Sequence, residues 1–327
     1  MKEKVLILGG TQFIGRNLVE RLLDSDTYQL TLFNRQISNA AIFPQCRKIK
    51  GDRSTSDIEQ VNDTDWDFVI DLSCYYPAQL ESLIANLKSP PRQFIFVSTC
   101  SVYDNGIDQT ILRNEDAAVH SCTPEEAIDR DDNTYGQRKA ESERVLAKSG
   151  LNHVILRPSL VYGRHDYTDR FYYWLYQAKF NSPLLLPDGG ERRFAITYVD
   201  DLVSAMVEAL TSNKPYSIYT ITSIPQVSIK AIVEQACSIF GTEPQIKSAS
   251  PEFLHANGVK PWVNMPLWLD CEYFTYSNER IKSDFDFRFV DFEASVKESI
   301  NHFDEIGWNE PTYGITEKER LSLIEKL

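Results

Sequence analysis

The chain has 327 residues, of which 42% are hydrophobic and 25% are charged, as in a soluble globular protein with one large domain or two that share a core. Its 34 Lys plus Arg and 47 Asp plus Glu give a net charge of −13, so nucleic acid, whose binding depends on neutralising phosphates, is not expected as a partner. The six cysteines show no CxxC or CxxH spacing, so we expect no metal site and predict reduced thiols in a cytoplasmic protein. No apolar run of about 18 residues and no signal peptide is found, so no membrane segment is expected.

In the first half of the chain, short apolar runs alternate with amphipathic segments. Residues 5–8 form a continuous apolar run that ends in glycines, which is typical of a strand buried on both faces. The expected strands are 5–8, 29–33, 47–50, 67–71, 93–98 and 153–156, and the expected helices are 14–23, 78–87 and 133–148. This alternation predicts an α/β protein with a doubly wound parallel sheet, the Rossmann fold.

The alternation is weaker in the second half. We expect helices at 169–178, 200–210, 229–240 and 292–303, strands at 194–198 and 216–220, and an irregular stretch from 245 to 275. The strand at 216–220 is expected to join the main sheet. The predicted division is a dinucleotide-binding domain of residues 1–163 plus about 194–222, and a smaller interleaved substrate lobe of about 164–193 plus 223–327.

A glycine-rich turn follows the first strand and precedes the first helix, which is the context of a dinucleotide-binding motif. Gly9 permits the sharp turn, Gly10 lets the backbone approach a phosphate, and Gly15 lets the helix pack on the sheet. A pyrophosphate would lie at the helix N-terminus, where free amides and the helix dipole favour negative charge. The predicted cofactor contacts of this turn are Gly9, Gly10, Thr11, Gln12, Phe13, Ile14 and Gly15.

The residues after the next strands give further predicted cofactor contacts. Asn34 and Arg35 end the second strand, where an enzyme that selects NAD usually carries an acid, and they offer a donor and a cation to a 2′-phosphate. They therefore favour NADP, with NAD as the alternative. The adenine is expected near Asp52 and the inner ribose near the backbone that follows the fourth strand. The remaining predicted contacts are Arg53, Leu72, Ser73, Cys74, Ser98, Pro158 and Leu160.

Three side chains, those of Thr99, Tyr135 and Lys139, predict proton exchange with a substrate hydroxyl or carbonyl. Tyr135 and Lys139 lie at i and i+4 of one expected helix and so share a face. A nearby ammonium favours the phenolate, so we expect Lys139 to lower the pKa of Tyr135, which then exchanges a proton with a substrate hydroxyl or carbonyl. Lys139 is also expected to hold the nicotinamide ribose. Thr99, at the end of the fifth strand, is expected to hydrogen-bond the same substrate oxygen.

This order of motifs resembles the extended short-chain dehydrogenase/reductase superfamily, which includes nucleotide-sugar epimerases and dehydratases. In that family the catalytic Ser or Thr lies four residues before the Tyr of a Val-Tyr pair, here Val102-Tyr103, which selects Thr99. The segments 156–163 and 198–201 are similar to the family's later strand and helix start. The glycine turn, the Phe-Asn-Arg ending at 33–35 and the segment 164–171 resemble a side branch with isoflavone-reductase-like and chloroplast stem-loop-binding proteins, some of which bind RNA.

The resemblance implies an NAD(P)-dependent oxidoreductase or epimerase that acts on a hydroxyl or keto group of a small molecule, with a nucleotide sugar as one candidate. Dehydration is disfavoured because Cys100 and Ser101, rather than an acidic pair, follow Thr99. Candidate substrate contacts are Tyr75, Cys100, Arg170 and Arg193, the arginines as partners of an anionic substrate. The alternatives are a non-catalytic nucleotide-binding redox sensor and an RNA-binding relative of the stem-loop type. A homodimer through the helices at 78–87 and 133–148 is implied by analogy of fold.

Overall fold

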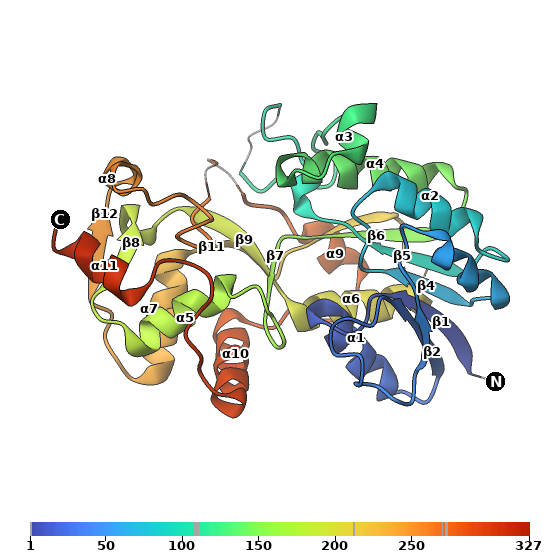
Figure 1. Cartoon of the computed structure of the whole chain (residues 1–327), viewed down its shortest axis with the longest axis horizontal. Coiled ribbons are helices and arrows are strands. Elements are labelled where there is room, and N and C mark those ends of the chain that lie inside the picture. The colour runs from blue at the N-terminus through green and yellow to red at the C-terminus, as the bar shows by residue number, and fades with distance from the viewer. Residues whose placement is uncertain (1, 108–110, 212, 270, 272–273) are drawn as a thin grey trace.

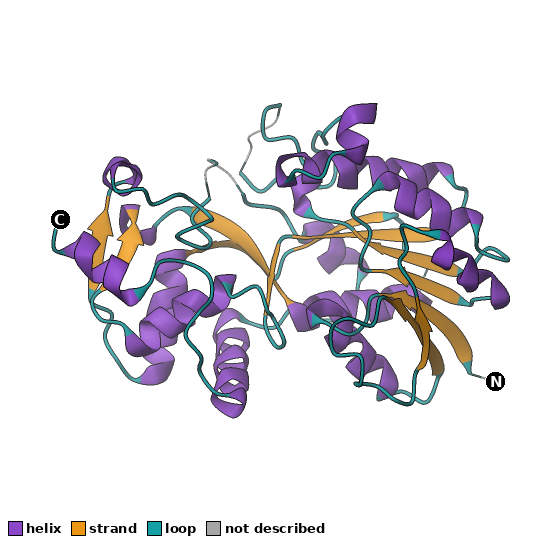
Figure 2. Cartoon of the chain, viewed as in Figure 1, coloured by secondary structure: helices purple, strands orange, loops and turns teal. Residues whose placement is uncertain are grey.

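The structure is a computed structural model that describes residues 2–107, 111–211, 213–269, 271 and 274–327. Figures 1 and 2 show two lobes. The larger lobe holds the N-terminus and a sheet with helices on both faces, and the smaller lobe holds the C-terminus.

The larger lobe is built on a parallel sheet. Within the described residues it has seven strands in the order β10-β6-β5-β4-β1-β2-β3. They are β1 (Glu3–Leu8), β2 (Tyr28–Asn34), β3 (Arg47–Lys50), β4 (Phe68–Asp71), β5 (Gln93–Val97), β6 (His153–Pro158) and β10 (Ile218–Ile221). The predicted doubly wound fold and the late strand of the main sheet are confirmed. The strand order reverses between β1 and β4, where sheets of this kind bind ligands beyond their carboxyl ends.

Helices cover both faces of this sheet because successive side chains of a strand point to opposite sides. The covering helices are α1 (Phe13–Leu23), α2 (Pro77–Ala85), α4 (Tyr135–Lys148) and α6 (Val199–Thr211). Val5 and Ile7 of β1 belong to the core that includes α1 and α6, which pack on each other. Leu6 and Leu8 belong to the core that includes α2 and α4, which also pack on each other. The continuous apolar run of β1 is therefore explained by burial on both sides.

The smaller lobe contains two short sheets and most of the C-terminal helices. β7 (Leu160–Tyr162), β9 (Arg193–Tyr198) and β11 (Ile224–Ser228) form one sheet, and β8 (Leu184–Pro187) pairs with β12 (Ile246–Ala249). Its helices are α5 (Arg170–Phe180), α7 (Ile229–Phe240), α8 (Pro251–Ala256), α10 (Phe292–Ile306) and α11 (Glu317–Ile324). The other elements are α3 (Pro124–Ile128), α9 (Glu279–Asp284) and the 3-10 helices η1 (Ser56–Asp63), η2 (Cys100–Val102), η3 (Asp132–Thr134) and η4 (Asp188–Gly190).

The second half of the chain differs from the expected elements in two places. The stretch 245–275, which was expected to be irregular, contains β12 and α8, and α11 lies beyond the last predicted helix. The strand expected at 194–198 exists as β9, but it pairs with β7 and β11 and lies outside the seven-stranded sheet. The domain boundaries stay a prediction. In the described part of the chain, no helix has the length and apolar character that crossing a membrane requires.

Candidate active site

A pocket of about 430 Å³ lies at the carboxyl ends of β1 to β4, where the strand order reverses. Its walls come from the glycine turn, the segment after β2, the segment after β3, the segment after β4 and one loop of the smaller lobe. The lining residues are Gly9, Gly10, Thr11, Gln12, Phe13, Ile14, Gly15, Phe33, Asn34, Arg35, Gln36, Ile37, Ser38, Gly51, Asp52, Arg53, Ser54, Leu72, Ser73, Tyr75, Gln79 and Tyr167.

The glycine turn forms one wall because its backbone is closely packed. Gly9 and Gly10 have φ angles of 111° and 97°, which side-chain-bearing residues rarely adopt. A Cβ on Gly15 would lie 2.6 Å from the backbone nitrogen of Gly10, so only glycine allows α1 to start this near the turn. Gln12 caps α1 without a side-chain hydrogen bond, which leaves the first amides of the helix without that partner. All seven predicted residues of the turn line the pocket.

The end of β2 is held against this turn. The Asn34 side chain donates to the carbonyl of Gly9 at 3.1 Å and accepts from the backbone of Gln36 at 2.9 Å. Asn34 therefore braces two segments of the pocket wall. Arg35 is exposed and lines the pocket, and within the described residues no carboxylate lies within ion-pair distance of its guanidinium. The cation that the sequence predicted here is available to a ligand.

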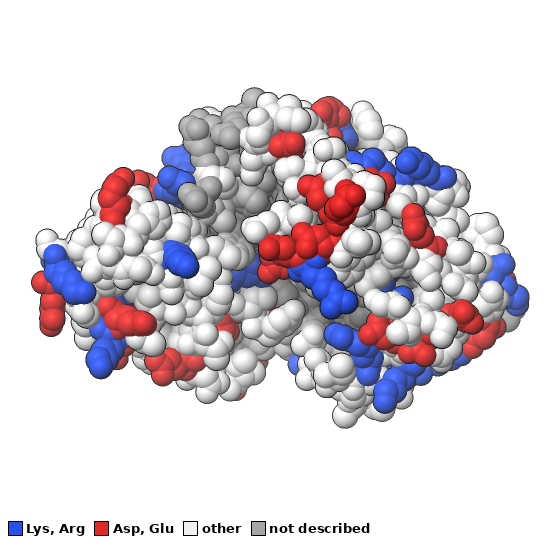
Figure 3. Space-filling view, turned by 45° about the horizontal axis from the view of Figure 1, so that its top comes forward, with Lys and Arg blue, Asp and Glu red and all other residues white. Residues whose placement is uncertain are grey.

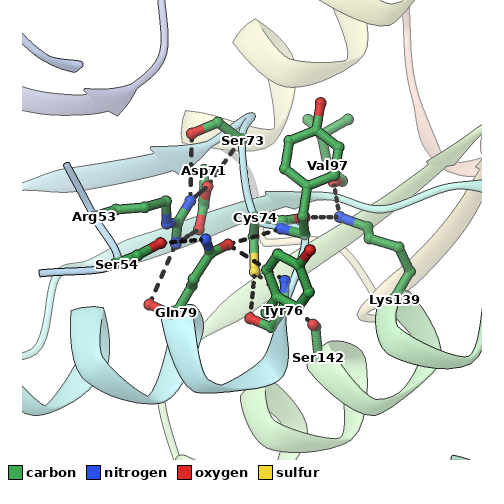
Figure 4. A network of polar contacts seen from close by, with 11 residues as sticks. Arg53, Ser54, Asp71, Ser73, Cys74, Tyr76, Gln79, Val97, Lys139 and Ser142 are labelled. Atoms are coloured by element: carbon green, nitrogen blue, oxygen red, sulfur yellow. Dashed lines mark hydrogen bonds and ion pairs between the residues drawn. The ribbon is translucent and has the colours of Figure 1, made fainter. Parts of the chain in front are cut away.

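A buried ion pair lies under the pocket, between the ends of β3 and β4 (Figure 4). The guanidinium of Arg53 donates to both carboxylate oxygens of Asp71, at 2.6 and 2.8 Å, and to the Ser73 hydroxyl at 3.3 Å. Burial alone would lower the pKa of Arg53, but the charge of Asp71 outweighs this and raises it. Asp52, which was expected near the adenine, lines the pocket and accepts from the backbone of Ser54 at 2.9 Å.

Tyr135 and Thr99 lie close together beside the pocket. Tyr135 begins α4, and the Thr99 side chain lies near enough to its phenol to lower the pKa of that group. The next residue makes this possible: a Cβ on Gly136 would lie 2.2 Å from the carbonyl oxygen of Ser101, so glycine lets α4 approach the segment after β5. The Tyr135 ring lies 6.3 Å from that of Tyr75, which lines the pocket. Two of the three predicted catalytic side chains are thus close together.

The pKa of Tyr135 differs from the expectation. Burial raises it well above the usual value, the neighbouring Tyr75 adds to this, and the nearby Thr99 side chain and the charge of Arg138 offset only part of the rise. Desolvation outweighs the nearby cations because a phenolate loses more hydration than it gains from them. The phenol is therefore protonated at neutral pH.

Lys139 is buried, and its ammonium reaches between the ends of β4 and β5 (Figure 4). It donates to the carbonyls of Cys74 at 3.1 Å and Val97 at 2.8 Å, and it lies 4.1 Å from the ring centre of Phe96. Burial lowers its pKa. The ammonium is thus held at the edge of the sheet where the ribose was expected, with backbone oxygens as its partners.

Several other predicted residues have side chains that other partners occupy. The Ser98 hydroxyl donates to Glu143, and the Cys100 thiol donates to the carbonyl of Arg157 at 3.3 Å. Arg170 lies over the ring of Trp262, 5.0 Å from its centre, and Arg193 donates to Gln226 at 3.1 Å. The predicted residues that lie outside the pocket lining are Cys74, Ser98, Thr99, Cys100, Tyr135, Lys139, Pro158, Leu160, Arg170 and Arg193. Ser98 and Cys100 are almost fully buried, and their side chains already have protein partners.

Comparison with known proteins now decides the family. Residues 5–222 match the NAD dependent epimerase/dehydratase family, and this match covers well over half of the chain. The chain belongs to this family. The match begins in β1 and ends just after β10, so it takes in the whole seven-stranded sheet.

Individual relatives of this epimerase/dehydratase chain are more distant. It is 27% identical over 272 residues to the chloroplast stem-loop binding protein of 41 kDa b from Arabidopsis thaliana, a match that covers 78% of this chain and 66% of that protein. The fold is similar to that of UDP-glucuronic acid 4-epimerase from Bacillus cereus, solved with UDP-glucuronic acid and NAD, with a TM-score of 0.72, 18% identity, and coverage of 93% of this chain and 100% of that one. UDP-glucose 4-epimerase from Thermotoga maritima, solved with UDP-glucose, gives a TM-score of 0.72, 18% identity, and coverage of 93% and 99%.

Sequence reasoning about this family member missed several pocket residues. Gln79 and Tyr167 line the pocket but lie on α2 and on the loop between β7 and α5, far in sequence from the glycine turn. Only three-dimensional packing brings them there. Gly136 was also missed, although a glycine directly after the catalytic tyrosine candidate is a usable signal of close helix approach.

Proposed function

We propose that this chain is an NAD(P)-dependent oxidoreductase or epimerase that acts on a hydroxyl or keto group, with Tyr135 as the acid–base group. The observation that carries the proposal is that Tyr135 lies near Thr99 and beside the glycine-turn pocket. Tyr75 links the two, because it lines the pocket and lies 6.3 Å, ring to ring, from Tyr135.

The pocket fits a dinucleotide. The close packing of Gly15 on Gly10 sets the N-terminus of α1 against the glycine turn, and the free backbone amides of this helix end suit a pyrophosphate. Arg35 suits a 2′-phosphate, and no acid stands beside it at the end of β2, so we propose NADP as the preferred cofactor. Several proteins of similar fold were solved with NAD, which is the alternative. When bound, a nicotinamide ring supplies or accepts the hydride.

The chain's own residues handle the proton. Because burial raises the pKa of Tyr135, its phenol keeps a proton that it can give to a substrate carbonyl. Thr99 lies near this phenol and is the proposed second hydrogen-bond partner of the same substrate oxygen. In the reverse direction a positive charge must assist the removal of the proton, and Lys139 is the buried cation one helical turn along α4.

The substrate class rests on the relatives. Structural neighbours were solved with UDP-glucuronic acid or UDP-glucose, so we propose nucleotide sugars as the first class to test. Arg170 and Arg193 remain candidates for an anionic substrate, although both now have other partners. Unchanged affinity of Arg170→Ala and Arg193→Ala for such a substrate would exclude them.

The test uses Tyr135→Phe. Wild type is incubated with NADP or NAD and a panel of UDP- and dTDP-sugars, and products are followed by mass spectrometry. For the substrate that turns over, we expect the variant to bind the cofactor as wild type does and to lose ~10²–10⁴-fold in turnover. Tyr216→Phe, at an exposed tyrosine outside the pocket, is the control. Unchanged turnover in Tyr135→Phe would contradict the proposed acid–base role.

A second candidate function is RNA binding, which the name of the Arabidopsis relative favours. The net charge of −13 opposes it. Figure 3 shows a band of acidic side chains across the middle of the face that it draws, with basic side chains directly beside it. A redox sensor without turnover remains the third possibility, and turnover that depends on Tyr135 would rule it out.

A cytoplasmic location and a homodimer also belong to this proposal. The helices α2 and α4, through which a dimer is proposed to form, pack on each other on one face of the main sheet. Sedimentation velocity of the purified chain distinguishes a dimer from a monomer of 37.5 kDa.

A further inference from the structure

Two exposed tyrosines border the pocket from opposite lobes. Tyr75 follows β4 of the larger lobe and is 53% exposed, whereas Tyr167 lies in the loop between β7 and α5 and is 64% exposed. Both line the pocket. The pKa of Tyr75 reflects the same neighbours. Burial raises it, the phenol of Tyr167 raises it further, and the charge of Arg35 lowers it. Two phenols and one cation therefore surround the same opening.

Tyr75 is held in place through its backbone. Its amide donates to the side-chain oxygen of Gln79 at 2.9 Å, and its carbonyl accepts from Arg138 at 3.3 Å. Gln79 itself lines the pocket and donates to the Ser54 hydroxyl at 2.8 Å. The segment that carries Tyr75 is thus tied to α2, to α4 and to the segment after β3.

The loop that carries Tyr167 is hydrogen-bonded to α1, the helix that follows the glycine turn. The buried Asn17 of α1 donates to the carbonyls of Phe13 and Arg164, each at 2.9 Å. Further along, Asp166 accepts from the backbone of Thr168 at 2.9 Å. The first bond ties the start of the loop to α1, and the second stabilises the local turn that contains Tyr167, whose exposed ring lines the pocket.

We propose that Tyr75 and Tyr167 act as an aromatic clamp on a bound dinucleotide and slow its release. The inference rests on the proposed function. Both tyrosines line the same pocket as the glycine turn, so their hydroxyls are donors for the phosphate oxygens of a bound dinucleotide and their rings supply contact area for it. Slow release suits a reaction in which the hydride returns to the same substrate, so the clamp favours epimerisation over simple reduction.

The test is a stopped-flow measurement of NADPH release from the full chain. Protein loaded with NADPH is mixed with excess NADP, and the loss of bound-NADPH fluorescence gives the dissociation rate. Tyr75→Ala and Tyr167→Ala are each expected to raise this rate at least ~10-fold, with a much smaller change in the association rate. Tyr75→Phe and Tyr167→Phe keep the ring and are expected to give intermediate rates. Tyr216→Ala is the control, since Tyr216 is 52% exposed and lies outside the pocket.

The outcomes separate the two proposals. If wild type binds NADPH and either alanine variant releases it at the wild-type rate, the clamp is excluded while the proposed function stands. If wild type binds neither NADPH nor NADH, both proposals fail. Thermal unfolding without nucleotide shows whether each variant is folded. If an alanine variant is not folded, the release rate of the corresponding phenylalanine variant, which lacks only one hydroxyl, tests the clamp instead.

Discussion

At the scale of single residues, the Arg53–Asp71 pair is the most deeply buried charge pair at the pocket. The Arg53 side chain is 8% exposed and that of Asp71 is 0% exposed, so neither charge is compensated by water. The pair fixes the ends of β3 and β4 relative to each other. Removing one partner leaves the other charge buried and alone, which costs far more than losing a surface ion pair.

Arg53→Ala is therefore expected to lower the free energy of unfolding by about 3–5 kcal/mol. Arg47→Ala is the matched control, because Arg47 pairs with Asp63 at the surface with 46% and 47% of the two side chains exposed, and about 0–1 kcal/mol is expected. Urea denaturation measures both variants. A similar small loss in the two would show that Asp71 is solvated or compensated in another way.

Asp166 gives a prediction of pH dependence. Burial raises its pKa from 3.8 to about 6, against the opposing hydrogen bonds from Thr168. A raised carboxyl pKa in the folded protein means that this group's stabilising contribution is complete below the unfolded value near pH 4 and is lost as the pH rises through about 6. Burial of the charged form then weighs against folding above that range.

Asp166→Asn keeps the acceptor for Thr168 and removes the charge. We compare the free energy of unfolding of the variant with that of wild type. The difference, variant minus wild type, should increase by up to about 3 kcal/mol as the pH rises from 4 to 8. Denaturation curves at several pH values check this, with Glu59→Gln at an exposed carboxyl as the control for loss of one charge. A pH-independent difference would mean that Asp166 titrates as in the unfolded chain.

Local order and spacing predicted the turn residues, which line the pocket, and also Thr99 and Tyr135, whose catalytic roles stay a prediction. The local pattern did not show that Ser98 and Cys100 turn inward. Their partners, Glu143 and Arg157, lie on α4 and β6 and form a buried ion pair of their own. Which neighbour a side chain finds depends on contacts between distant segments, and these are not visible in a local pattern.

At the scale of elements, the approach of α4 to the segment after β5 positions the catalytic pair. Gly136→Ala would place a Cβ 2.2 Å from the Ser101 carbonyl oxygen and force the helix outward. We expect a stability loss of about 1–3 kcal/mol and a larger effect on turnover than on NADPH affinity, because Tyr135 moves with the helix.

Gln137→Ala, on the same helix turn, is the control, since it adds no atom. Urea denaturation and steady-state kinetics with the substrate found for wild type give the comparison. Wild-type turnover in Gly136→Ala would show that the proximity of Tyr135 and Thr99 does not depend on this close approach.

Most strands of the main sheet, such as β1 and β5, could be predicted because they are continuous apolar runs that alternate with helices along the chain. The short strands β8 and β12 could not, since each has four residues and gains its hydrogen bonds only from the other, some sixty residues away. The same holds for β7, a three-residue strand that pairs with β9.

At the scale of the whole molecule, charge separates the leading proposal from the RNA alternative. With a net charge of −13, this chain is expected not to bind a stem-loop RNA at ~150 mM salt, because phosphate binding needs clustered cations. Filter binding across a range of salt concentrations tests this. Tight binding whose affinity falls steeply with salt would instead favour the function named for the Arabidopsis relative.

Titration with NADPH and NADH, followed by fluorescence, tests whether the glycine-turn pocket holds a nicotinamide dinucleotide next to Tyr135. We expect saturable binding by wild type, tighter for NADPH, and loss of that binding in Gly15→Val, where the added side chain collides with Gly10. Gly106→Val, at an exposed loop outside the pocket, should bind as wild type does. Absence of binding by the folded wild type, or undiminished binding by a folded Gly15→Val, would contradict the account.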